Sequence, residues 1–258
     1  MDVKELLSLK GKIVVVTGGS GLYGKCLVEG LAEAGGTVIT TSRDIKSAEK
    51  TAAFFHEKGL DVYPMEVDQG ETESVNRFTN NLKEKFGKLH VFVNNAVSRP
   101  MKGYNAPLSD FDESMRVNAT GMWDLLKSMS DLIIESGGGA VINISSMMGM
   151  KGPDLSNYDG TSMGDLPPDY FFHNAGMINL TRFMAKMNAG KNIRFNCISP
   201  GGLFNNQPEK FVENYNKKVP MKRMANNDDI KGLAVLLASE AGAYINGENI
   251  LMDGGLNA

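Results

Sequence analysis

The chain has 258 residues, enough for one large α/β domain with a buried core. Hydrophobic residues make up 42% and charged residues 22%, as in ordinary soluble globular proteins. The formal net charge of −3 gives no basic field that would attract nucleic acid or an anionic membrane, so neither partner is expected. No apolar stretch is long enough for a signal peptide or a membrane span, which predicts a soluble cytoplasmic protein.

The two cysteines, Cys26 and Cys197, lie far apart and match no metal-ligand spacing. One falls in a predicted helix and the other in a predicted strand, so we expect both to be small buried hydrophobic residues. No metal site is expected.

Short apolar, β-branched runs alternate with longer amphipathic stretches along the chain. We expect strands at Ile13–Thr17, Thr37–Thr41, Asp61–Val67, Val91–Asn94, Ala140–Ile144, Arg194–Ile198 and Asn249–Met252. We expect helices near Leu22–Ala34, Ile45–Lys58, Glu73–Phe86, Phe111–Glu135, Tyr170–Asn188 and Asp228–Ser239. This alternation predicts a parallel sheet, and the continuous apolar runs indicate that helices cover both of its faces.

The alternation of predicted strands and helices leaves no room for a linker, so residues 1–258 are expected to form a single domain. One segment, residues 151–168, departs from the alternation, because it has many Gly, Pro, Ser and Asp residues between a strand and a helix. A connection of that length is usually a lid or a disordered loop. A lid is the preferred interpretation, because the segment follows the carboxyl end of a central strand, where ligands of open α/β sheets bind.

A glycine-rich turn, Thr17-Gly18-Gly19-Ser20-Gly21-Leu22-Tyr23-Gly24, connects the first strand to the first long helix. Such a turn can bring backbone N–H groups close to a pyrophosphate at a helix N-terminus. Glycines alone are a weak signal, since any tight turn uses them. The position between a first strand and a helix favours a nucleotide site of the Rossmann type.

This segment resembles the glycine motif of the short-chain dehydrogenase/reductase family, TGxxxGxG in its short single-domain members. Leu22 stands where the middle glycine falls, and the spacing also resembles the TGxxGxxG of the extended members. The resemblance implies a three-layer, doubly wound Rossmann fold with a seven-stranded parallel sheet and an NAD(P) cofactor. The residues it places on the cofactor phosphates are Gly18, Ser20, Gly21, Leu22, Tyr23 and Gly24.

The tip of the second strand indicates which cofactor is used. An acid there would bind the adenosine ribose and select NAD, but by spacing that place falls on Ser42, followed by Arg43. An arginine can bind a 2′-phosphate through charge-assisted hydrogen bonds, which favours NADP. The alternative is that Arg43 is a solvated loop charge and Asp44 binds the ribose, which would permit NAD.

Three further strand ends resemble family motifs around the cofactor. Asp68 stands where the family contacts adenine, and Asn95-Ala96 resembles the family's NNAG, with Val97 replacing the glycine. The turn after the sixth strand resembles the family's Pro-Gly turn at the nicotinamide, which implies contacts from Pro200, Gly201 and Leu203.

The family's catalytic serine is matched by Ser146, with Ser145 beside it, and its helical asparagine by Asn118. Two tyrosines compete for the acid/base role. Tyr158 lies nearer the usual interval from the serine, but it is followed by helix breakers. Tyr170 begins a helical segment that resembles the family's YxxxKAG, and we select it.

Asn174 replaces the lysine of that motif. An ammonium near a phenol lowers the phenol's pKa, and an asparagine brings no such charge, although it can still bind a ribose hydroxyl. His173 is expected to point away from position 174, and Lys186 lies several turns distant, so neither is a substitute. Three explanations of Asn174 are open. It is an inactivating substitution introduced into the chain, it belongs to a natural active site that is slow at neutral pH, or the protein keeps the fold for binding alone.

On the substrate side, Asp154, Asn157, Tyr158 and Asp159 in the lid, with the substrate loop at about residues 202–222, offer neutral and acidic hydrogen-bonding groups. These groups suit a sugar, a sugar acid or a polyol, and the chain also resembles family members that act on sugars or gluconate. The last strand and the two longest helices resemble the family's subunit contacts, which implies a homotetramer or else a dimer. The alternatives are a cofactor-binding protein without turnover and a redox-neutral epimerase or dehydratase.

Overall fold

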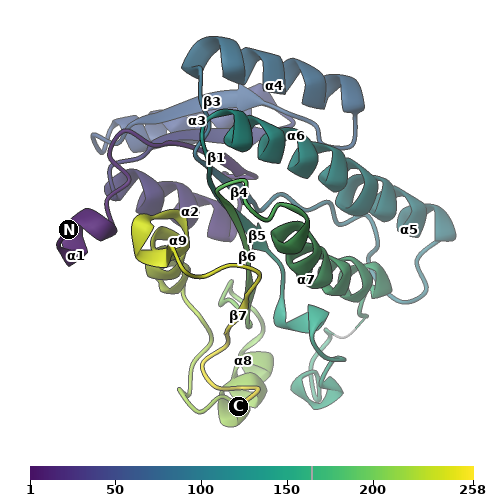
Figure 1. Ribbon diagram of the computed structural model, residues 1–258. Helices are drawn as coiled ribbons and strands as arrows, with labels where there is room; N and C mark the ends of the chain where they lie inside the picture. Colours follow the sequence, from purple (N-terminus) through teal and green to yellow (C-terminus); the bar gives the residue numbers. More distant parts are fainter. Residues whose placement is uncertain (164) are drawn as a thin grey trace.

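A computed structural model describes residues 1–163 and 165–258. Seven strands form one all-parallel sheet in the order β3-β2-β1-β4-β5-β6-β7, with helices on both faces, so the predicted three-layer α/β fold is confirmed (Figure 1). The strands are β1 Ile13–Thr17, β2 Thr37–Ser42, β3 Val62–Glu66, β4 Val91–Asn94, β5 Gly139–Ile144, β6 Ile193–Pro200 and β7 Asn249–Met252. The strand order reverses between β1 and β4, where such folds place a ligand crevice.

The helices follow the expected order with shifted ends. They are α1 Val3–Leu6, α2 Leu22–Glu33, α3 Ile45–His56, α4 Thr72–Phe86, α5 Leu108–Met115, α6 Met122–Glu135, α7 Pro168–Met187, α8 Glu209–Lys218 and α9 Lys231–Ala238. Short 3-10 turns lie at Met147–Gly149, Leu155–Asn157, Asn227–Ile230 and Glu240–Gly242. Neither α1 nor α8 was predicted, because both are short and polar, and α8 falls in the segment expected as a loop.

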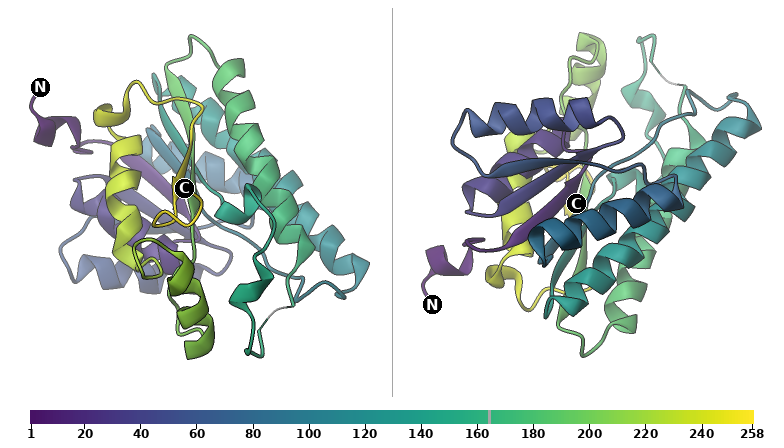
Figure 2. Two further views of the ribbon diagram at one scale, coloured as in Figure 1. Left: turned by 90° about the horizontal axis from the view of Figure 1, so that it is seen from below. Right: turned by 90° about the horizontal axis from the view of Figure 1, so that it is seen from above.

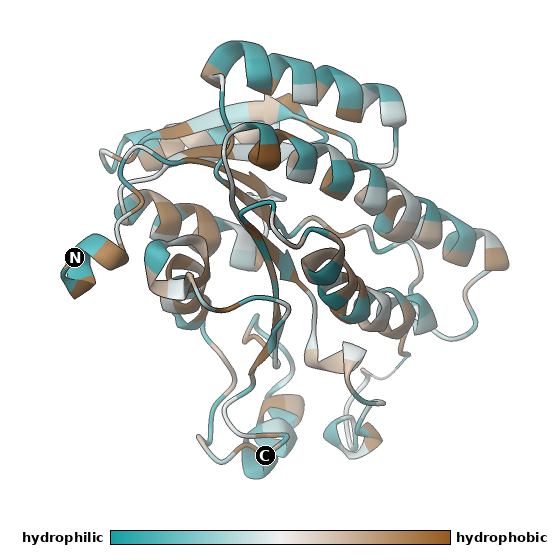
Figure 3. Ribbon diagram, viewed as in Figure 1, coloured by the Kyte–Doolittle hydropathy of each residue, from teal (hydrophilic) through white to brown (hydrophobic). Residues whose placement is uncertain are grey.

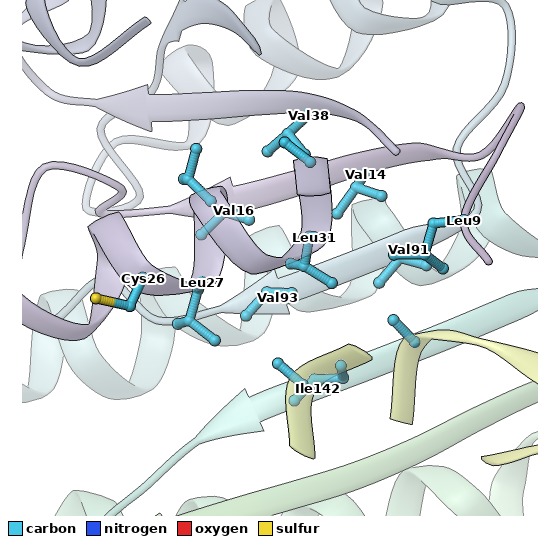
Figure 4. Close-up of a cluster of buried hydrophobic side chains, with 14 of the residues drawn as sticks. Leu9, Val14, Val16, Cys26, Leu27, Leu31, Val38, Val91, Val93 and Ile142 are labelled. Carbon is cyan, nitrogen blue, oxygen red and sulfur yellow. The ribbon is translucent and has the colours of Figure 1, made fainter. Parts of the chain in front are cut away.

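The sheet separates two hydrophobic cores, because successive strand residues point to opposite faces. Val14 and Val16 of β1 pack with α2, α3 and α9, whereas Val15 packs with α4, α6 and α7. Figure 2 shows the layers from two further directions, and Figure 4 shows the first of these cores. The outward face of α4 is largely hydrophilic (Figure 3). Cys26 and Cys197 are both buried and free, as expected.

The predicted long helix Phe111–Glu135 is interrupted. Residues Arg116–Gly121 form a π-helical turn between α5 and α6. Within it, Asn118 Oδ1 accepts a hydrogen bond from Ser98 N at 2.8 Å, and Asn118 Nδ2 donates to Ser98 O at 2.7 Å. A π turn widens the helix locally and commonly marks a functional site. Here it turns Asn118 toward the loop that follows β4.

Hydrogen bonds join the expected lid, residues 151–168, to the substrate loop. Residue 164 of this segment lies outside the described residues. The Lys218 ammonium at the end of α8 donates to Asp154 Oδ2 and to Asn157 Oδ1, both at 2.8 Å, and also to Ser156 Oγ. Asn214 Nδ2 donates to Asp159 O at 3.0 Å. These contacts tie α8 to the described part of the lid segment.

Candidate active site

A cavity of about 710 Å³ lies at the carboxyl ends of the strands. Its walls come from the tips of β1, β2, β4, β5 and β6, the start of α7 and the segments on either side of α8. Of the residues predicted to be catalytic or to bind the cofactor, all but Asp68 line it. Of the predicted residues, those that line it are Gly18, Ser20, Gly21, Leu22, Tyr23, Gly24, Ser42, Arg43, Asn95, Ala96, Asn118, Ser146, Tyr170, Asn174, Pro200, Gly201 and Leu203.

The glycine turn has little room for side chains. Gly18 has φ +64°, a left-handed conformation that favours glycine, and a Cβ on Gly24 would collide with the Gly18 carbonyl oxygen. A Cβ on Gly19 would collide with Thr40 Oγ1, a requirement that the sequence motif did not reveal. The backbone at the N-terminus of α2 is therefore open to a pyrophosphate, so the turn fits the dinucleotide that the sequence predicts.

Hydrogen bonds join the turn to the tip of β4. The Asn95 side chain donates to Thr17 O at 2.8 Å and to Gly18 O at 3.2 Å. In return, the Thr17 hydroxyl accepts from the backbone N–H groups of Asn95 and Ala96, at 2.9 and 3.0 Å. Asn95 therefore holds the two strand ends on either side of the crevice.

At the tip of β2, Ser42 and Arg43 line the cavity and Asp44 does not. Asp44 instead caps α3, with Oδ1 accepting from Lys46 N at 3.1 Å. Asp68 is likewise engaged elsewhere, because its Oδ1 accepts from Gly70 N at 2.9 Å. The cavity wall at the end of β3 is made by Val67 and Gln69, which the sequence analysis did not single out.

Tyr170 lies in the first turn of α7, beside the residues matched to the serine and the lysine. Ser146 Oγ accepts from Met148 N at 3.2 Å, which caps a 3-10 turn. Ser145 Oγ lies 3.1 Å from Asn174 Oδ1 and 3.0 Å from Asn174 O, and Asn174 Nδ2 donates to Tyr170 O at 2.7 Å. Both ends of the buried Asn174 amide are thus engaged within the protein.

His173 was expected to point away from position 174, and both residues nevertheless line the cavity. Its ring stands edge-on to the Tyr170 ring, with centroids 5.6 Å apart, and neither ring nitrogen has a partner among the described residues. Burial lowers the pKa of His173 to about 4; the nearby Asp169 carboxylate opposes this shift, and the positive charge of Arg99 adds to it. The imidazole is therefore neutral near pH 7. Lys186 lies outside the cavity wall.

The lid segment contributes only part of the groups expected of it. Asn157 and Tyr158 line the cavity, whereas Asp154 and Asp159 do not. The hydrogen bond from Lys218 holds the pKa of the Asp154 carboxyl below its usual value. Burial raises the pKa of Tyr158, whose ring packs 5.2 Å from that of Phe211. Of the expected neutral and acidic groups, only the neutral ones line the cavity, because Asp154 is paired with Lys218 and Asp159 lies outside the wall.

The described residues contain neither a metal-ligand cluster nor a membrane-spanning helix. Within residues 1–163 and 165–258, no three or more His, Cys, Asp or Glu side chains are grouped so that they could hold a metal ion. No helix in this described part is both long enough and apolar enough to cross a membrane.

Comparison with known proteins identifies the family. Residues 23–257 match a family model described as enoyl-(acyl carrier protein) reductase. An NADP-dependent mannitol dehydrogenase of Hypocrea jecorina is 34% identical over 97% of this chain and 94% of its own length. The chain belongs to the short-chain dehydrogenase/reductase family and is an oxidoreductase of the kind that uses NAD(P).

Other relatives are similar over nearly their whole length. A 3-oxoacyl-[acyl-carrier-protein] reductase of Aquifex aeolicus is 28% identical over 97% of this chain and 99% of its own. Among solved structures, a gluconate 5-dehydrogenase from Burkholderia cenocepacia, in complex with NADP and tartrate, has a TM-score of 0.87 and 25% identity, covering 99% of this chain and 98% of its own.

The crowding at the glycine turn predicts that Gly24→Ala weakens cofactor binding by about tenfold or more, roughly 1.4 kcal/mol, because the new Cβ displaces the Gly18 carbonyl. The matched control is Gly232→Ala, also in a helix, where a Cβ would meet nothing within 4 Å. Fluorescence titration with NADPH measures both. Equal affinities in the two variants would contradict this role of the turn.

The buried imidazole predicts a loss of stability in acid. Above about pH 6.5, His173 is neutral in both the folded and the unfolded chain. As the pH falls from about 6.5 toward 4, only the unfolded chain binds the proton, so the free energy of unfolding falls by about 2 kcal/mol at pH 5.

Urea unfolding at pH 7 and pH 5 measures this change. His173→Gln should reduce the difference between the two pH values, whereas His56→Gln, at a solvent-exposed position, should keep it. An unchanged difference in His173→Gln would show that other groups cause the acid sensitivity.

Proposed function

We propose that this protein interconverts an alcohol and a carbonyl on a sugar, a sugar acid or a polyol, with NADP as the preferred cofactor and Tyr170 as the acid/base. The observation that carries the proposal is that Tyr170 and the glycine turn line one continuous cavity, together with Ser146 and Asn118. The mannitol and gluconate dehydrogenases among the similar proteins support this class of substrate.

In the reductive direction, the bound cofactor supplies a hydride to the carbonyl carbon. The Tyr170 hydroxyl donates the proton that the carbonyl oxygen takes up, and in the oxidative direction Tyr170 takes that proton back. Ser146 is proposed to hydrogen-bond the same oxygen. Asn118 holds the loop after β4 in place through Ser98, so its contribution is to position the cavity wall.

The tip of β2 supports NADP. Arg43 lines the cavity, while the Asp44 carboxylate that could have selected NAD caps α3. Ser42 adds a neutral hydroxyl that does not repel a 2′-phosphate. Together these three residues favour a phosphorylated ribose at this end.

Arg43→Gln should therefore weaken NADPH binding by about 10- to 100-fold, since a hydrogen bond to a charged group contributes about 1.5–3 kcal/mol. NADH, which lacks the 2′-phosphate, is the internal control and should bind both forms equally. Fluorescence titration measures the two affinities. A parallel loss for both cofactors would mean that Arg43 does not contact the phosphate.

The choice between the two tyrosines has a direct test. Tyr170→Phe should lower turnover by about 10²- to 10⁴-fold, the usual contribution of a general acid. Tyr158→Phe, the matched change on the opposite wall of the cavity, should lower it less than tenfold. Steady-state rates with a sugar acid or polyol decide the matter, and the reverse order of effects would assign the proton to Tyr158.

Asn174→Lys should raise turnover near neutral pH and move the activity profile toward lower pH, because a charge at contact range typically shifts a pKa by ~1–3 units. Asn174→Met is the control, because methionine is a long unbranched side chain like lysine but carries no charge. The measurement is the pH dependence of kcat in the three forms. Equal rates and equal profiles would show that the task of the family's lysine is done elsewhere.

A second candidate function rests on Asn174 itself. A protein that binds NADP but does not turn over would keep the glycine turn and lose the lysine's charge at position 174, as this chain does. Cofactor binding without turnover, in both the natural protein and Asn174→Lys, would favour this candidate.

We also propose a lid and a homo-oligomer. The contacts of Lys218 and Asn214 support a lid in which the described part of residues 151–168 moves together with α8. Phe172, Phe183 and Met187 are all at least half exposed and share one face of α7, which supports a homo-oligomer, a tetramer in preference to a dimer.

A further inference from the structure

The charged side chains that line the cavity are all cationic. Among the described residues of its wall there are two arginines, Arg43 and Arg99, with no lysine, aspartate or glutamate. Arg43 lies at the tip of β2, where the ribose is proposed to bind. Arg99 lies in the segment after β4 and contacts Tyr170, so the proposed cofactor phosphates do not account for its charge.

Arg99 lies against the proposed acid/base. Its Cζ is 5.2 Å from the centroid of the Tyr170 ring, a cation–π contact. No carboxylate of the described residues pairs with it, although the chain forms ion pairs at many other places. A guanidinium stacked on a ring keeps the N–H groups at its edge free, and this planar fork matches a carboxylate.

His173 is a second and independent indication of a ligand at the same place. Its side chain is only 7% exposed, lines the cavity and contacts the same ring as Arg99. Neither of its nitrogens has a partner within the described part of the chain. An unpaired buried polar group costs about 1–3 kcal/mol, which a hydrogen-bonding ligand would recover.

The acids near this end are held away from the cavity. Asp169 is buried, lies outside the wall and accepts a hydrogen bond from the Ser114 hydroxyl through Oδ2. Asp154 is paired with Lys218. Among the described residues, Arg99 is therefore the only charged side chain of the cavity wall at Tyr170, and the buried Asp169 carboxylate acts on His173 from outside the wall.

We propose that Arg99 and His173 recognise an anionic substrate, with Arg99 binding the carboxylate of a hydroxy or keto acid while His173 donates to one of its oxygens. The inference rests on the proposed oxidoreductase function and narrows it, within the class of sugars, sugar acids and polyols, to the acids. A carboxylate fits better than a phosphate, because one guanidinium and one neutral imidazole together offer a single positive charge.

The test compares gluconate with sorbitol, which carries a hydroxymethyl group in place of the carboxylate on the same six-carbon chain. In the natural protein with NADP, kcat/KM for gluconate should exceed that for sorbitol at least tenfold. Arg99→Gln should reduce this ratio at least tenfold, mainly by raising KM for gluconate, and Arg99→Lys should fall between. Arg77→Gln, an exposed arginine on α4 outside the cavity, should keep the ratio.

An equal loss for both substrates would overturn the inference and assign Arg99 an effect on Tyr170 instead. A preference for sorbitol would overturn it as well.

Binding separates this inference from the proposed function. Calorimetric titration of gluconate into the NADP-loaded protein should show binding that Arg99→Gln abolishes and His173→Gln weakens. If that result appears while no alcohol or ketone is turned over, the anion site stands and the proposed function fails. If gluconate does not bind, or if inorganic phosphate competes with it at equal concentration, carboxylate recognition is wrong.

Discussion

The exchange of hydrogen bonds between Thr17 and Asn95 is the constraint on which the rest of the site depends. It joins the end of β1 to the end of β4, the two strands between which the order of the sheet reverses. Sheet pairing already aligns β1 with β4 as far as Val16 and Val93, and this exchange extends the alignment into the glycine turn and the loop after β4. With it, the backbone proposed to bind pyrophosphate and the loop that carries Arg99 face one cavity from adjacent strands.

The far side of that cavity is fixed by a second set of contacts. Asn118, in the π-helical turn, binds both backbone groups of Ser98 and also donates to the Ser114 hydroxyl, which in turn donates to Asp169 in the first turn of α7. The loop after β4, the long helix pair and α7 are thus connected through buried polar groups. Tyr170 and Arg99, which lie on two of these connected segments, contact each other. Asn118 takes part in this connection from a π-helical turn that interrupts the long helix.

The fold could be predicted almost entirely, because its signal is repeated along the chain. The observed bounds of β1, β4 and β7 are the predicted ones, because each strand contains a short apolar run that turn residues delimit. The glycine turn and Tyr170 were found because local motifs specify them. What the sequence could not reveal depends on contacts between distant residues: the π turn at Asn118, the pairing of Asp154 with Lys218, and the position of Arg99 on the Tyr170 ring.

His173 shows what helix geometry alone leaves open. Neighbours on a helix point in different directions, so it was expected to face away from position 174, yet His173 and Asn174 both line the cavity. At Asp68, the adenine contact stays a prediction. Its Oδ1 accepts a hydrogen bond within its own turn, and its neighbours Val67 and Gln69 line the cavity.

We propose that this cavity brings a nicotinamide cofactor and a carbonyl together beside Tyr170. Transfer of deuterium from NADPH that carries two deuterium atoms at the nicotinamide C4 position tests this most directly, with the product examined by mass spectrometry and NMR. We predict one deuterium on the carbon of the new alcohol, with one cofactor oxidised for each product formed. A product without deuterium, or turnover without net oxidation of the cofactor, would contradict it.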